Sequence, residues 1–258
     1  MKHYNIYSYV QKGLSHREDV CEDTALLGNS ILREGYAESV AGSYFLAGVA
    51  DGIGGMPAGE LASRETMKRL SQYEPDRLLL TDCRSYLEEI NDHIRGIGET
   101  RPDCRGLGCT LTLLGNLREG LYVFQLGNSR LYKATDKSLI LLTMDHNIGR
   151  DEFREGMLDE EELERLMCSP KAAYLTSFIG MDRERFTEKL EYRELKHSEE
   201  TTYFLTTDGI HDHLSYEELS VLMRAELPPE KLLKEMAEQA VKSGSVDDIS
   251  IVMVKGEE

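Results

Sequence analysis

The chain has 258 residues, of which 40% are hydrophobic and 30% are charged, a balance typical of a soluble globular protein with a sizeable core. Its 47 acidic residues outnumber its 30 basic ones, and the net charge of -17 disfavours nucleic acid and anionic membranes as partners. The sequence has no run of about 18 apolar residues, so we expect no transmembrane helix. The segment MKHYNIYSYVQKG also lacks the apolar region of a secretory signal, so we expect a cytoplasmic protein.

The cysteines predict reduced thiols rather than disulfides or a structural zinc site. Their number is odd and no two of them form a CxxC pair. The five are Cys21, Cys83, Cys104, Cys109 and Cys168.

Short runs rich in β-branched and aromatic residues predict strands along the chain. They cover Tyr44–Ala50, Cys109–Leu114, Gly120–Leu126, Ser129–Ala134, Ser138–Leu142, Thr202–Thr207 and Ile249–Val254. The first and the sixth of these runs are nearly all apolar, and each ends directly in Asp-Gly. Such strands would deliver an aspartate at the edge of a buried sheet.

Apolar residues at every third or fourth position predict helices in other segments. Three such segments are Ala58–Tyr73, Leu80–Ile97 and Leu232–Val241, and Gly244 is a plausible stop for the last. Strands grouped in hairpins favour antiparallel sheets with helices packed outside, and a regular βαβ alternation is absent. Because no linker or composition shift divides the chain, we expect one catalytic domain over residues 1–258.

Acidic residues recur at the ends of the predicted strands. They are Glu22 and Asp23, then Asp51 before Gly52, then Asp208, and finally Asp247 and Asp248. A carboxylate beside a buried strand is unfavourable unless it is paired, hydrogen-bonded or bound to a metal. Carboxylates and water are the ligands that Mg²⁺ and Mn²⁺ prefer. Each Asp-Gly alone is only a turn signal, so the information lies in the order and combination.

This combination resembles the type 2C, or PPM-type, metal-dependent protein serine/threonine phosphatases, in a variant like those of bacteria. The matching motifs are collinear and span nearly the whole chain. They are EDT at Glu22–Thr24, FLAGVADGIGGMPAGELAS at Phe45–Ser63, GCT at Gly108–Thr110, LGNSRLY at Leu126–Tyr132, LTMDHN at Leu142–Asn147, LTSFIG at Leu175–Gly180, LTTDGIHDHLS at Leu205–Ser215 and DDISIVMV at Asp247–Val254.

The resemblance implies an α+β fold, a four-layer α-β-β-α sandwich of two stacked antiparallel sheets flanked by helices. It also implies a centre for two Mn²⁺ or Mg²⁺ ions. Asp51 would bridge the two ions, and the Gly52 carbonyl would bind one of them. Asp208 and Asp247 would complete one site. Glu22 would hold a metal partly through water, and its neighbour Asp23 would act as a ligand or position one.

The implied reaction is hydrolysis of phosphoserine or phosphothreonine in proteins. A water or hydroxide between the two ions would attack phosphorus in line, without a covalent phosphoenzyme. Asp51, Asp208 and Asp247 are thus the expected catalytic residues, and no cysteine or serine nucleophile is required. The expected partners are phosphorylated proteins and, in signalling, an opposing serine/threonine kinase.

The chain departs from the family pattern around the phosphate. Glu18 stands where the family often has a phosphate-binding arginine, with His16 and Arg17 just before it. Either residue could approach the phosphate, although a structural role suits His16 equally. Ile53 replaces a histidine that is a candidate general acid in many eukaryotic members.

Two further departures affect the metals. Asn128 replaces an aspartate linked to a third, weaker ion, and a neutral amide is a poorer ligand for a hard cation, so a third metal is in doubt. Asp248 stands where asparagine is usual and could tighten metal binding or simply face solvent. The irregular segment 147–173 resembles the family's flap, a common place for substrate selection.

Two alternatives remain at this level. One is a catalytically silent, phosphatase-like binding module, which Asn128 and the missing arginine favour but the full set of aspartates does not. The other is a zinc hydrolase built on His211 and His213, whose spacing would place both rings on one face of a strand. However, Ser215 followed by Glu218 predicts the start of a helix nearby.

Overall fold

A computed structural model describes residues 3–14, 20–53, 58–74, 79–167, 174–196 and 201–257. Two antiparallel sheets form its centre. The first has the strand order β4-β1-β12-β11-β8-β9 and the second the order β10-β7-β6-β5-β2-β3. The first sheet consists of β1 (His3–Gln11), β4 (Gly35–Ala41), β8 (Arg130–Ala134), β9 (Leu139–Leu141), β11 (Thr202–Thr206) and β12 (Ile249–Glu257). The second consists of β2 (Asp23–Leu27), β3 (Ser30–Leu32), β5 (Phe45–Asp51), β6 (Leu111–Leu117), β7 (Gly120–Leu126) and β10 (Glu191–Leu195).

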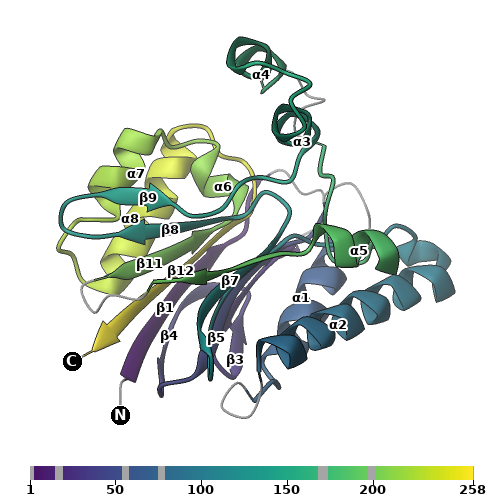
Figure 1. The fold of residues 1–258 in the computed structure, drawn as a ribbon. Coiled ribbons are helices and arrows are strands. Elements are labelled where there is room, and N and C mark those ends of the chain that lie inside the picture. The colour runs from purple at the N-terminus through teal and green to yellow at the C-terminus, as the bar shows by residue number, and fades with distance from the viewer. Residues whose placement is uncertain are drawn as a thin grey trace.

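Helices cover the outer face of each sheet, as Figure 1 shows. Helices α1 (Gly59–Leu70) and α2 (Leu80–Thr100), with α5 (Arg183–Lys189), lie on the second sheet. Helices α6 (Asp208–His211), α7 (Tyr216–Leu222) and α8 (Pro229–Lys242) lie on the first. The predicted four-layer α-β-β-α sandwich is therefore confirmed.

Three apolar clusters hold these layers together. The middle cluster fills the space between the sheets and includes Val10, Val49, Leu131 and Val252. A second cluster joins α1 and α2 to one sheet, and a third joins α6, α7 and α8 to the other. Burying so much apolar surface on both faces of each sheet fixes the strand ends, where the acidic residues lie.

All seven predicted strands are present, with ends shifted by a few residues, and the three predicted helices correspond to α1, α2 and α8. Ser215 caps α7 and forms a reciprocal capping box with Glu218. The chain leaves α8 through Gly244, whose φ of +103° suits a glycine. Sequence reasoning missed β1, β2, β3, β4 and β10.

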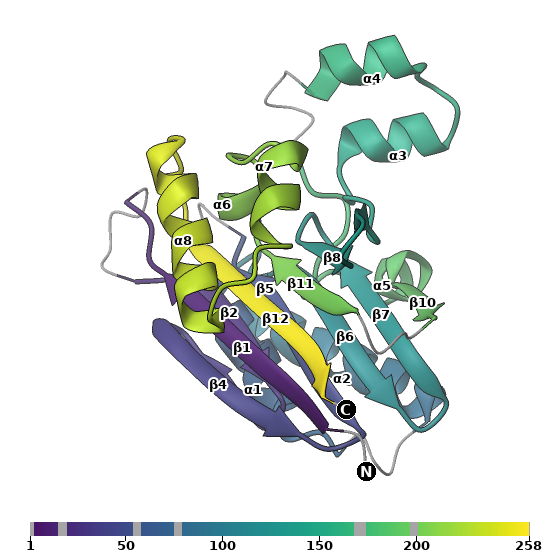
Figure 2. The ribbon, with the colours of Figure 1, turned by 90° about the vertical axis from the view of Figure 1, so that its left-hand side faces the viewer.

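Part of the expected flap stands apart from the sandwich. Helices α3 (Ile148–Arg154) and α4 (Glu160–Met167) project beyond one end of the sheets (Figure 2). Asn147 caps α3 by accepting a hydrogen bond from the Arg150 amide. The rest of the predicted insert, residues 168–173, lies outside the described residues.

Candidate metal centre

The acidic residues from four distant segments meet at one end of the sandwich. Asp23 opens β2 and Asp51 closes β5, and the two are direct partners in the antiparallel register. On the other sheet, Asp208 follows β11 and Asp247 precedes β12, and these strands are also paired. Thr207 joins the two sheets here, because its hydroxyl donates a 2.7 Å hydrogen bond to Oδ2 of Asp23.

The backbone of Asp51 is fixed by a neighbouring strand. Its amide donates to Oγ1 of Thr110 at 3.0 Å, and its carbonyl accepts from the Thr110 amide at 2.8 Å. The Thr110 hydroxyl lies 2.8 Å from that of Ser129, within hydrogen-bond distance. Sequence reasoning gave these two residues no role, although Thr110 belongs to the GCT motif and Ser129 to the LGNSRLY motif. Their hydroxyls hold the end of β5 in place without adding charge.

Two glycines allow Glu22 to approach this strand end. A Cβ on Gly52 would lie 2.3 Å from the carbonyl carbon of Gly59, and one on Gly59 would lie 2.6 Å from Oε1 of Glu22. The Gly52 amide also donates to the Glu22 carbonyl at 3.1 Å. The first turn of α1, the Asp51-Gly52 turn and the Glu22 carboxylate can pack this closely only because both residues are glycine.

The carboxylates act on one another unfavourably. Burial, followed by the charges of Asp208, Asp23 and Asp247, raises the pKa of Asp51 well above its usual value. Burial and the Asp248 charge do the same to the pKa of Asp23. For Asp208, burial and then the charge of Asp247 raise the pKa to about 6. The charges that act most strongly on Asp51 are all carboxylates, so this end of the molecule favours a cation.

A hydrated divalent cation fits these residues. Oδ1 of Asp23 is buried and has no hydrogen-bond partner among the described residues. Within the same residues, no group of three or more His, Cys, Asp and Glu side chains is arranged as a ready ligand set. Mg²⁺ and similar ions keep several waters and need only one or two carboxylates each. Carboxylates spread around a shared space suit that coordination better than a closed protein cage.

Known protein phosphatases are similar to this chain in sequence. No family model matches the chain. A type 2C protein phosphatase of Streptococcus pyogenes is 26% identical over 215 residues, which cover 81% of this chain and 85% of that protein. The serine/threonine protein phosphatase PstP of Mycobacterium tuberculosis is 27% identical over 227 residues, 86% of this chain and 42% of PstP.

Solved structures share the fold over nearly the full chain. The phosphatase Stp1 of Staphylococcus aureus has a TM-score of 0.76 at 20% identity, with 98% of this chain and 95% of that chain covered. The crystal structure of M. tuberculosis PstP has a TM-score of 0.76 at 24% identity, with 98% of each chain covered. This chain is therefore similar to PPM-type protein phosphatases in sequence and in fold.

One departure from the PPM-type pattern has a structural role at the metal centre. Asn128 donates a 2.9 Å hydrogen bond from Nδ2 to Oδ2 of Asp208. An aspartate at position 128 would place a further carboxylate against Asp208 instead. Nearby, the Arg130 guanidinium donates two hydrogen bonds to the Asp145 carboxylate, at 2.9 and 2.7 Å. This pair fixes the chain just before the flap segment 147–173.

The second departure, Asp248, does not face solvent. It is 2% exposed and accepts two backbone hydrogen bonds, from Gly13 at 2.7 Å and from Glu22 at 2.6 Å. That option of the sequence analysis is therefore wrong, because Asp248 ties the backbone of Gly13 and of Glu22 to the start of β12. Its neighbour Asp247 is half-buried, and its charge contributes to the raised pKa values of Asp23, Asp51 and Asp208.

Several expected site residues lie outside the described residues. They are His16, Arg17 and Glu18, together with Gly54, Gly55 and Cys168. Of the thiols, Cys21, Cys83, Cys104 and Cys109 are free and buried. Burial raises the pKa of Cys109 to about 12, which makes this thiol a poor nucleophile.

The zinc alternative is not supported. His211 ends the short helix α6 rather than lying on a strand, and its Nδ1 is 2.8 Å from the Thr206 hydroxyl. Burial and the charge of Arg130 keep the pKa of His211 well below its usual value. The ring is therefore a neutral, buried structural group.

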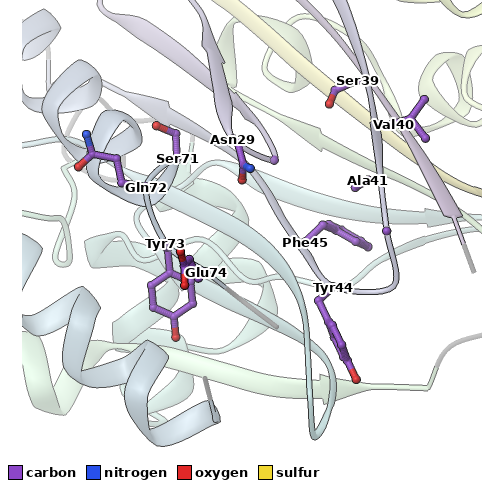
Figure 3. A pocket seen from close by; sticks show the side chains of 12 residues that line it. Asn29, Ser39, Val40, Ala41, Tyr44, Phe45, Ser71, Gln72, Tyr73 and Glu74 are labelled. Atoms are coloured by element: carbon purple, nitrogen blue, oxygen red, sulfur yellow. The ribbon is translucent and has the colours of Figure 1, made fainter. Parts of the chain in front are cut away.

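A separate groove lies at the opposite end of β5, away from the acidic cluster. It has a volume of about 510 Å³ and includes the Tyr44–Phe45 turn, Asn29 and the residues after α1 (Figure 3). Among the described residues that line it, only Glu74 carries a carboxylate. A single acid gives no basis for a two-metal site there.

Proposed function

We propose that the chain is a metal-dependent protein serine/threonine phosphatase with two Mn²⁺ or Mg²⁺ ions. The observation that supports this most strongly is the convergence of Asp23, Asp51, Asp208 and Asp247 from two sheets. The similarity to PPM-type phosphatases supports the same reaction class. The catalytic domain of PstP, similar in fold with a TM-score of 0.70 and 24% identity, has been solved with two manganese ions.

The proposed ligands follow the positions of the acids. Asp51 would hold both ions, the Gly52 carbonyl would bind one of them, and Asp208 and Asp247 would complete one site. Glu22 would reach one ion, and Asp23 would either bind or orient a ligand. When bound, the ions supply the Lewis acidity that activates water and neutralises charge on a phosphoryl group.

The chain's own residues hold these groups in place before substrate arrives. Thr110 and Thr207 fix the backbone of Asp51 and the carboxylate of Asp23 by hydrogen bonds. The buried thiol of Cys109 takes no part, in keeping with hydrolysis by water. Ile53 offers no proton, so the leaving group must be protonated from another source, and His16 and Arg17 remain proposed phosphate contacts.

The wider role is also a proposal. The substrates would be phosphorylated proteins, the setting signalling against an opposing kinase, and the location the cytoplasm. Among the described residues, no helix has the length and apolar character needed to span a bilayer. We further propose that residues 1–258 form one catalytic domain, with 147–173 as a flap that contributes to substrate selection.

The test is Mn²⁺-dependent hydrolysis of an aryl phosphate by the wild type and by Asp208→Asn. A matched control is Asp136→Asn, an exposed aspartate between β8 and β9. We expect the Asp208 variant to lose at least about 100-fold in kcat/KM and the control to keep full activity. A folded wild type with no activity at any Mn²⁺ concentration would instead favour the silent binding module.

A further inference from the structure

A second pocket, of about 460 Å³, lies beside the metal centre and contains positive charge. It is formed by the last turns of α2, the turn that follows α2, and the loop at Gly180. Its charged lining residues are Arg95, Glu99 and Arg105, two cations against one acid. In a chain with a net charge of -17, such a local excess of arginine is unusual and attracts anions selectively.

The guanidinium groups have unused donors. Arg105 is exposed and forms no hydrogen bond or ion pair with any residue that the structure describes. Nε of Arg95 lies 3.5 Å from Oε1 of Glu99, yet it is buried and lacks a hydrogen-bond partner in the described chain. A carboxylate placed between Arg95 and Arg105 would accept hydrogen bonds from the exposed Arg105 guanidinium and would be attracted by the charge of Arg95.

The backbone around the pocket is fixed. Cys104–Leu107 form a type II turn, with Arg105 at φ -62° and ψ 124°, Gly106 at φ +83°, and a 3.0 Å hydrogen bond from Leu107 N to Cys104 O. Gly180 lies so close that a Cβ there would be 2.5 Å from the Leu107 carbonyl oxygen. The buried Asn91 holds this loop by bonding both the Gly180 amide and the Met181 carbonyl. Arg105 therefore projects from a rigid turn.

The pocket is within reach of a substrate bound at the metals. Ile53, next to the Asp51-Gly52 turn, donates a 3.0 Å hydrogen bond to the Gly108 carbonyl. Gly52 is paired with Cys109, and Leu107 lies only two residues before it, a span of at most about 7 Å. A residue three or four positions from a phosphoserine can reach about 10–14 Å along an extended peptide.

We propose that this Arg95–Arg105 pocket binds an acidic side chain of the phosphoprotein substrate, a few residues from the phosphorylated one. The inference rests on the proposed phosphatase function and adds a preference to it. The ligand chemistry is a carboxylate of aspartate or glutamate. The pocket lies outside the metal ligands, so it changes which phosphoproteins are selected and not the hydrolysis itself.

The experiment compares phosphopeptides whose flanking residues are glutamate, alanine or lysine on both sides of the phosphoserine. Arg105→Glu is compared with Arg118→Glu, the same charge change on an exposed turn between β6 and β7. We expect Arg105→Glu to raise KM for the glutamate peptide about five- to tenfold at unchanged kcat. It should leave the alanine peptide and a small aryl phosphate within about twofold, and favour the lysine peptide.

Two controls keep the outcome decisive. Circular dichroism and thermal unfolding check the fold of each variant, and Arg105→Ala with Arg95→Ala repeats the test without an added acid. Binding of the labelled peptides to metal-free protein, followed by fluorescence anisotropy, measures the preference without catalysis. The proposal is overturned if the wild type shows no preference for the glutamate peptide, or if Arg105→Glu and Arg118→Glu change it equally. Absence of aryl phosphate hydrolysis in the wild type would contradict the phosphatase function, and the anisotropy series would still decide the pocket.

Discussion

Asp23 and Asp51 face each other directly in the register of β2 and β5. Like charges in opposite positions of an antiparallel pair are destabilising, and burial of both strengthens the repulsion. The sheet thus holds an arrangement that is unfavourable in the metal-free protein and favourable once cations are present. Stability without metal and activity with metal should therefore respond in opposite directions to the loss of one charge.

Asp51→Asn tests this opposition. Without metal, the variant should be more stable than the wild type by about 1 kcal/mol, because the substitution removes the repulsion between Asp51 and the neighbouring carboxylates. With Mn²⁺, it should gain little stability and lose activity on an aryl phosphate. Differential scanning calorimetry with EDTA and with Mn²⁺ measures both effects. Asp136→Asn serves again as the control, and a metal-free Asp51 variant that melts below the wild type would contradict the argument.

The pH dependence of the metal-free protein follows from Asp208. Its pKa is about 6 in the folded chain, against roughly 3.9 in an unfolded one. Between these pH values the folded state binds one more proton at Asp208 than the unfolded state does. The contribution of Asp208 to stability is therefore greatest below about pH 4 and is lost as the pH rises to about 6. Thermal melts in EDTA from pH 4 to 7 should show this decline, and Asp208→Asn should flatten it. A wild-type stability that instead rises over this range, with no change in Asp208→Asn, would count against the assignment.

Asn128→Asp restores the acid that the PPM-type pattern usually carries. The substitution replaces the 2.9 Å hydrogen bond to Asp208 by a repulsion between carboxylates. Without metal the variant should lose about 1–3 kcal/mol of stability. With Mn²⁺, calorimetric titration should show one additional weak binding event over the two expected for the wild type. Asn128→Ala removes the hydrogen bond without adding charge, so it should destabilise the protein but add no event.

Asp248 offers a test of loop positioning. Asp248→Ala leaves the buried amides of Gly13 and Glu22 without their acceptor, at a cost of about 2–4 kcal/mol. Because Glu22 loses its anchor, the Mn²⁺ concentration for half-maximal activity should also rise. Asp248→Asn keeps one acceptor oxygen and should fall between the wild type and the alanine variant. Equal metal requirements in all three proteins would show that Asp248 does not position Glu22.

The sequence predicted the part of the fold whose signals are local. The apolar runs before Asp51 and Asp208 became buried strands, and Ser215 with Glu218 predicted a helix start. Strand β1 was missed because tyrosine, asparagine and serine alternate there with only two aliphatic residues, Ile6 and Val10. The role of Asp248 could not be predicted, because its partner Gly13 is 235 residues away in the chain. For the same reason Thr110 was noted only as part of a motif, since its contact with Asp51 depends on how β5 and β6 pair within one sheet.

The junction between the flap and the sandwich gives the last prediction. Lys189 at the end of α5 pairs with Asp151 of α3 at 2.9 Å, and Arg154 of the same helix pairs with Glu191 of β10 at 2.5 Å. Both pairs join α3 to the body, and the buried His146 lies 3.4 Å from Glu191 between them. These contacts are partly exposed, so each alone contributes little stability, but together they fix the helix direction.

The double variant Lys189→Ala with Arg154→Ala should release the flap without unfolding the sandwich. We expect faster proteolytic cleavage within residues 148–167 and a kcat/KM for a phosphoprotein that falls about fivefold. Aryl phosphate hydrolysis should stay within about twofold, because the metal ligands are untouched. The matched control is Lys137→Ala with Arg118→Ala, two exposed residues in hairpin turns away from the flap. If hydrolysis of the aryl phosphate falls as much as that of the phosphoprotein, the flap acts on the metal centre itself and not on substrate selection.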